Sequence, residues 1–144
     1  MSLTTFGAIM GFAAEMAGKT AEIYKALGQK AKDSTLKEVL QTLSLEEGKT
    51  RALMGKTRRE NVTEMILEPV TGLRREDYEI DLKILDQMED AAVMKGALTL
   101  EEKGKKFFRD ASSKVPLPEV ARIFRKIALK KEENLVKLQG LFRD

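Results

Sequence analysis

The sequence of 144 residues contains no histidine, no cysteine and no tryptophan, and only 3 prolines. Without cysteine the chain has no disulfide, no thiolate zinc site, no iron–sulfur cluster and no cysteine nucleophile. Without histidine it has no Ser-His-Asp triad, no imidazole base and no histidine-containing metal site. Any metal would have to be held by carboxylates, which favour oxygen-loving ions.

A strong charge of one sign and long apolar runs are missing as well. The chain has 26 Lys plus Arg and 23 Asp plus Glu, and its formal net charge is +3. The two signs are interspersed and no aromatic residues interleave the basic ones, so we expect no nucleic-acid partner. No apolar run approaches the roughly 18 residues of a membrane span, so we expect no membrane insertion. We interpret residues 1–144 as a single domain of a cytoplasmic protein.

What the sequence does contain is strong helix-forming character, with Lys, Leu, Glu and Ala as its most frequent residues. Apolar residues recur at spacings of three and four along four stretches. These spacings predict helices at about residues 5–30, 35–64, 79–112 and 118–142. Residues 67–78 are predicted to form the long second connection, and 115–118 a proline-containing break. The pattern favours an all-α four-helix bundle of two hairpins joined by a crossover.

The second half of the chain can be laid on the first without gaps at an offset of 101 − 17 = 84 residues. The halves are about residues 5–64 and 79–142. Conservative apolar pairs then coincide along two helices and the link between them: Leu36 with Val120, Val39 with Ile123, Leu40 with Phe124, and Leu43 with Ile127. This agreement indicates an internal repeat of an αα-hairpin.

Polar residues interrupt three of the four apolar stripes. They are Glu47 and Thr50 in the second stripe, Glu101 in the third, and Lys131 and Asn134 in the fourth. The repeat offset pairs Ala17 with Glu101, Glu47 with Lys131, and Thr50 with Asn134. We therefore expect a polar layer at one level of the bundle. The alternative is that Glu47 and Glu101 are surface or helix-boundary residues and that our helical register is off by one.

This layout resembles the rubrerythrin branch of the ferritin-like superfamily. In that family each half supplies a Glu seven residues before an aromatic on its first helix, and Glu-x-x-His on its second. The first-helix motif corresponds here to the segments Ala17…Tyr24 and Glu101…Phe108. The second-helix motif corresponds to Glu47-Gly48-Lys49-Thr50 and Lys131-Glu132-Glu133-Asn134. The resemblance covers about residues 5–142. It implies a ferritin-like bundle and, in the family, a di-iron centre that reduces peroxide.

Carried over residue by residue, the resemblance retains a ligating carboxylate only at Glu47 and Glu101. Ala17 and Lys131 stand at glutamate positions, Thr50 and Asn134 at histidine positions, and Tyr24 at the aromatic near the metals. Two carboxylates leave a di-iron(II) core with excess buried positive charge. We hypothesise that the Lys131 ammonium takes the place of a metal, bonded to both glutamates, with Thr50 and Asn134 completing the network. Glu46 is expected to be solvated.

Two functions follow from this interpretation. The first is a non-catalytic structural or interaction module, a homodimer without a cofactor and without enzymatic activity, that has lost the di-iron centre of its scaffold. The second is a metal-binding oxidoreductase or iron-handling protein that holds iron or manganese through Glu47 and Glu101.

Overall fold

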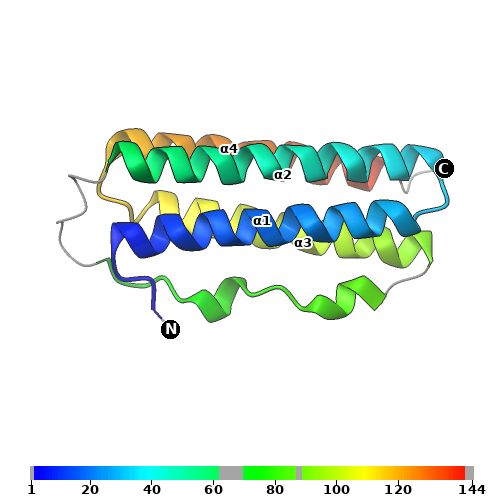
Figure 1. Ribbon diagram of the computed structural model, residues 1–144, viewed down its shortest axis with the longest axis horizontal. Helices are drawn as coiled ribbons and strands as arrows, with labels where there is room; N and C mark the ends of the chain where they lie inside the picture. The colour runs from blue at the N-terminus through cyan, green and yellow to red at the C-terminus, as the bar shows by residue number, and fades with distance from the viewer. Residues whose placement is uncertain (1, 62–69, 87–88, 142–144) are drawn as a thin grey trace.

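The chain is all-helical over residues 2–61, 70–86 and 89–141, which are the residues that the computed structural model describes. Its four long helices are α1 Phe6–Lys30, α2 Ser34–Glu60, α3 Asp90–Ser112 and α4 Pro118–Gly140 (Figure 1). Two short 3₁₀ helices, η2 Arg75–Tyr78 and η3 Leu82–Asp86, lie between α2 and α3. The prediction of an all-α chain is confirmed. The predicted end of the second helix, the start of the predicted connection and the predicted end of the fourth helix fall at residues 62–69 and 142, which lie outside the described residues.

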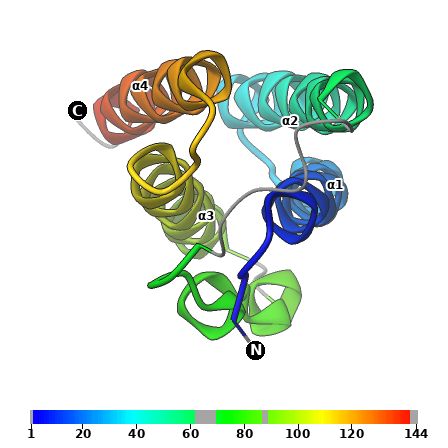
Figure 2. The same cartoon turned by 90° about the vertical axis from the view of Figure 1, so that its left-hand side faces the viewer.

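The four long helices form two antiparallel hairpins, α1 with α2 and α3 with α4 (Figure 1). Between the hairpins the chain returns along the side of α1 and α3, so α2 and α3 run in the same direction. Viewed from one end, the helices stand at four corners, with η2 and η3 outside α1 and α3 (Figure 2). Backbone hydrogen bonds from Leu3 N to Leu73 O and from Val70 N to Thr4 O, both 2.8 Å, fasten this connection to the start of the chain.

The first residues of α1 and α3, and those of α2 and α4, are separated by the same 84 residues as the offset found in the sequence. α1 begins at Phe6 and α3 at Asp90, and 90 − 6 = 84. α2 begins at Ser34 and α4 at Pro118, and 118 − 34 = 84. The side chain of Asp33 caps α2 by accepting from Leu36 N at 2.8 Å, whereas α4 starts on a proline, whose fixed φ suits a first turn.

The prediction that the third helix starts near residue 79 is wrong. Residues 79–86 belong to the connection, and α3 begins at Asp90. Ile80, Leu82 and Ile84 alternate along the sequence and do not extend the helical spacing of α3. The Asp90 carboxylate fixes the start of α3 by accepting the backbone N–H groups of Lys32 and Asp33, each at 2.9 Å.

The core consists of two apolar clusters, one toward each end of the bundle. One cluster is formed by side chains including Phe6, Ile9, Phe12, Met54, Phe107, Phe108 and Phe124. The other is formed by side chains including Ile23, Leu27, Leu40, Leu43, Met94, Leu100 and Leu138. On α2, α3 and α4, the residues between the two clusters are those at which the sequence interrupts its apolar stripe. None of the described helices is long and apolar enough to cross a membrane.

Candidate functional site

A polar layer lies between the two apolar clusters of the core. Glu47 comes from α2, Glu101 from α3, and Lys131 and Asn134 from α4, and all four side chains are buried. Each sits on the core-facing side of its helix, because each continues the three–four spacing of its apolar neighbours. The alternative that Glu47 and Glu101 are surface residues is therefore wrong.

The Lys131 ammonium lies at the centre of this layer. Its Nζ donates to Glu47 Oε1 in a salt bridge whose side chains are each only 5% exposed, and it lies 3.7 Å from Glu101 Oε2. The salt bridge between Glu47 and Lys131 joins two residues that the repeat places at equivalent positions. The predicted ion pair of Lys131 with both glutamates is present, but the predicted hydrogen bond forms only with Glu47, because Glu101 Oε2 lies beyond hydrogen-bond distance of the ammonium.

Tyr24 of α1 supplies the other contact to Glu101. Its hydroxyl donates to Glu101 Oε1 at 2.7 Å and lies 3.3 Å from the backbone oxygen of Ala97. The ring is fully buried, and burial followed by the charge of Glu101 raises the pKa of Tyr24 well above its usual value. Tyr24 is therefore a neutral donor at pH 7 that holds one oxygen of Glu101, while the other oxygen faces Lys131.

Gly104 gives the lysine side chain its space. A Cβ at position 104 would lie 2.7 Å from Cε of Lys131, 2.9 Å from Cδ and 3.0 Å from Nζ. Such distances are shorter than van der Waals contact, so any larger residue at position 104 would displace the ammonium. The sequence pattern did not identify Gly104 as part of the site. The available signal was its position three residues after Glu101, on the same face of α3.

Burial and charge act on the layer in opposite directions. Burial raises the pKa of Glu47, Lys131 lowers it by less, and the negative charge of Glu101 raises it again. Burial lowers the pKa of Lys131, but the carboxylates of Glu47 and Glu101 raise it by more, so the net direction is upward. Lys131 is therefore an ammonium ion at neutral pH, positioned between two carboxyl groups that would otherwise repel each other.

Thr50 and Asn134 do not complete the network, so this part of the prediction is wrong. Asn134 Nδ2 donates to Glu46 Oε1 at 2.8 Å, and Glu46 is only half-buried, which also corrects its expected solvation. The Thr50 hydroxyl bonds to the backbone oxygen of Glu46 within its own helix at 3.2 Å. The physical reason is that α2 and α4 meet at Glu46, on the α4-facing side of α2, so the Asn134 amide finds an acceptor there. Ala17 is buried and adds no polar atom.

The residues of the layer do not fit a di-iron centre. Within the described residues, no group of three or more Asp, Glu, His or Cys side chains is gathered to hold a metal ion. An ammonium lies between the only two carboxylates of the layer, and it would repel a cation placed there. Glu101 Oε2 has no hydrogen-bond partner in the described chain, but it faces this same ammonium. The donor set therefore suits the tethered lysine better than a metal ion.

A scan against models of protein families found none that matches this chain, and searches of curated proteins and of solved structures gave no match either.

Proposed function

We propose that the protein is a rubrerythrin-like member of the ferritin-like superfamily that has lost its di-iron centre and acts as a non-catalytic structural or interaction module. The observation that carries this proposal is the Lys131 ammonium between Glu47 and Glu101 at the centre of the core. A cation built into the chain offsets one of the two negative charges of carboxylates that in the family would hold iron. The layer thereby stabilises the bundle without a cofactor and without a site for chemistry.

The arrangement of the helices supports the ferritin-like part of the proposal. Two antiparallel hairpins are joined by a connection that runs the length of the bundle, which is the topology of ferritin-like folds with one long crossover. The equal offsets between the helix starts support a duplicated hairpin, and such a duplication places equivalent residues of the two halves at one level. As part of this proposal we expect the module to be a homodimer, which sedimentation equilibrium tests directly.

The decisive experiment restores the missing ligands. The variant Ala17→Glu, Thr50→His, Lys131→Glu, Asn134→His has the full ligand set of the family, and we expect it to bind two equivalents of iron or manganese. The matched control carries the same four changes together with Glu47→Gln and should bind less metal. Mass spectrometry measures metal content in both variants and in the wild type, which is expected to purify metal-free. Stoichiometric iron in the wild type, or no binding by a folded restored variant, would contradict the proposal.

The second candidate is a metal-binding oxidoreductase or iron-handling protein that uses Glu47 and Glu101. The observation in its favour is Glu101 Oε2, a buried carboxylate oxygen that accepts no hydrogen bond within the described chain and has capacity to accept a ligand. Thermal unfolding with Fe(II) or Mn(II) separates the two candidates. A rise in melting temperature that disappears in Glu47→Ala would favour the metal-binding protein, and no rise would favour the module.

A further inference from the structure

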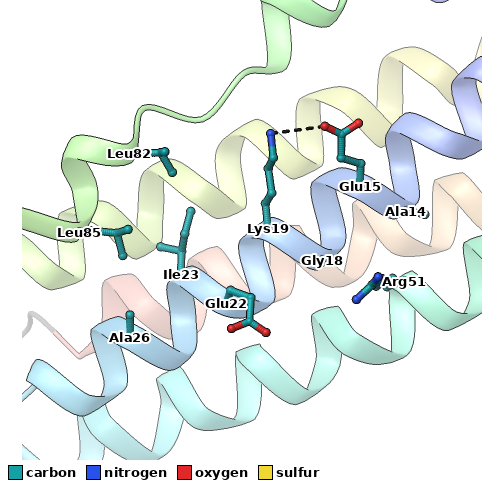
Figure 3. A pocket seen from close by; sticks show the side chains of 10 residues that line it. All are labelled: Ala14, Glu15, Gly18, Lys19, Glu22, Ile23, Ala26, Arg51, Leu82 and Leu85. Carbon is teal, nitrogen blue, oxygen red and sulfur yellow. Dashed lines mark ion pairs between the residues drawn. The ribbon is translucent and has the colours of Figure 1, made fainter.

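A groove of about 670 Å³ lies on the outer face of α1, away from the polar layer (Figure 3). Its floor is α1, one wall is formed by Arg51 of α2, and the other by Leu82 and Leu85 of η3. The volume lies within the range of about 300–1,000 Å³ that is typical of small-molecule sites. The groove is lined mainly by apolar surface, with a few charged groups, as such sites are.

One end of the groove is apolar. Leu82 and Leu85 face Ile23 and Ala26 across it (Figure 3). Leu82 is 61% exposed, and none of the residues of η3 is buried. A large apolar side chain that stays exposed in a concave wall gains free energy when an apolar ligand covers it.

The other end of the groove carries charges, of which Arg51 is the available cation. Arg51 lies against Gly18, where a Cβ would be 3.3 Å from Arg51 Cδ, so the glycine lets the side chain rest on α1. No ion pair or hydrogen bond of Arg51 is found within the described chain. Glu15, by contrast, already pairs with Arg75 at 3.0 Å and with Lys19 at 3.4 Å. Its negative charge is therefore compensated, and the guanidinium of Arg51 is not.

We propose that this groove binds a free long-chain carboxylate of the fatty-acid type. The alkyl chain lies along Leu82, Leu85 and Ile23, and the carboxylate is held by the guanidinium of Arg51. Arginine suits this role because its planar fork pairs with a carboxylate through two parallel hydrogen bonds. The exposed Glu22 lies between the two ends and opposes the ligand's charge, so it limits the affinity.

The test uses laurate below its critical micelle concentration and the uncharged dodecan-1-ol below its solubility limit, in calorimetric titrations of the whole chain. Laurate should bind at one site per chain. Arg51→Met should lower the affinity for laurate by about tenfold and leave the affinity for dodecan-1-ol unchanged, because only laurate pairs with the guanidinium. Glu22→Gln should strengthen laurate by about threefold, because it removes a repulsive charge at the surface. Leu82→Asp should weaken both ligands.

Arg58→Met is the matched control. Arg58 lies seven residues after Arg51 on α2, rests near Gly11 in the same way, with 3.5 Å from a Cβ to its nitrogen, and does not line the groove. The Arg58→Met protein should bind both laurate and dodecan-1-ol as the wild type does. The proposal would be overturned if the wild type did not bind laurate, or if both arginine variants lost the same amount of laurate affinity. It would also be overturned if the groove variants changed the self-association of the chain instead of its affinity for laurate. None of these residues takes part in the hydrogen bonds or ion pairs of the Lys131 layer, so this outcome is independent of the function proposed above.

Discussion

The two hairpins place their helices in the same register, yet at the polar layer they carry different side chains. Where the first hairpin has Glu47, the second has Lys131, and these two equivalent residues form the central salt bridge. Where the first has Ala17, the second has Glu101. The same charged side chain at both positions of either pair would have placed like charges together in the core, which is costly. The difference between the halves therefore places one positive charge against the two glutamates and reduces their mutual repulsion.

The same complementarity extends to the residues around these charges. Tyr24 carries the hydroxyl that Glu101 accepts, whereas its equivalent Phe108 has no hydroxyl. Gly104 leaves room for Lys131, whereas its equivalent is the larger, buried Thr20. Each hairpin is thus adapted to the side chains of the other. The layer draws side chains from both hairpins, and neither hairpin could form it by itself.

The largest effect is expected from removing the cation of the layer. Lys131→Met leaves two glutamates buried without their ammonium, and the loss of one partner of a buried ion pair costs about 3–5 kcal/mol. Urea unfolding at neutral pH, followed by circular dichroism, measures the change. The double variant Glu47→Leu, Lys131→Met removes one charge from each half and should be more stable than Lys131→Met alone. A Lys131→Met protein as stable as the wild type would contradict the structural role of the layer.

A smaller loss is expected from Gly104→Ala. The new Cβ overlaps the Lys131 side chain and should destabilise the protein by about 1–3 kcal/mol, the usual cost of overpacking. In a Lys131→Ala background this cost should vanish, which a double-mutant cycle detects. Gly48→Ala is the control, because a Cβ there meets nothing within 4 Å and alanine favours helix by up to about 1 kcal/mol. Equal changes in the free energy of unfolding for Gly104→Ala and Gly48→Ala would exclude a specific steric overlap between position 104 and Lys131.

Exchanging the aromatic residues sharpens the comparison between the halves. Tyr24→Phe removes the hydrogen bond to Glu101 and should cost about 1–2 kcal/mol. Phe108→Tyr adds a hydroxyl on the side where Ala17 offers no carboxylate, so it should also destabilise rather than compensate. Chemical denaturation of the two single variants and the double variant checks this. Full rescue in the double variant would mean that the two aromatic sites are interchangeable.

The smallest effect is expected from pH. The pKa of Lys131 is raised above its usual 10.5, so its contribution to stability is fully present below that pH and is lost as the pH rises through the raised pKa of the folded state. On the alkaline side, the stability gap between the wild type and Lys131→Met should therefore begin to narrow above about pH 10.5. Parallel denaturation series across this range test the sign. A gap that closes near neutral pH would show that the lysine is not held as an ammonium ion.

The helices and the members of the polar layer could be predicted from sequence because both depend on local spacing. The apolar periodicity located α1, α2 and α4 well, and the interrupted stripes identified Glu47, Glu101 and Lys131. The start of α3 was missed, because apolar residues at 80–86 can mimic a helical stripe while packing as a separate connection. The hydrogen bonds of Asn134 and Thr50 were also missed, because they depend on how α2 and α4 meet at Glu46.

By itself the sequence determined the helical class, the 84-residue offset between equivalent helix starts and the absence of a histidine-based site, since these follow from residue type and spacing. Only the tertiary structure decided which polar atoms meet. It placed Lys131 against Glu47 and near Glu101, directed the Tyr24 hydroxyl to Glu101, and gave Gly104 its role. The physical reason is that a hydrogen bond or a steric overlap changes within a fraction of an ångström, whereas helical periodicity specifies only which face of a helix a residue occupies.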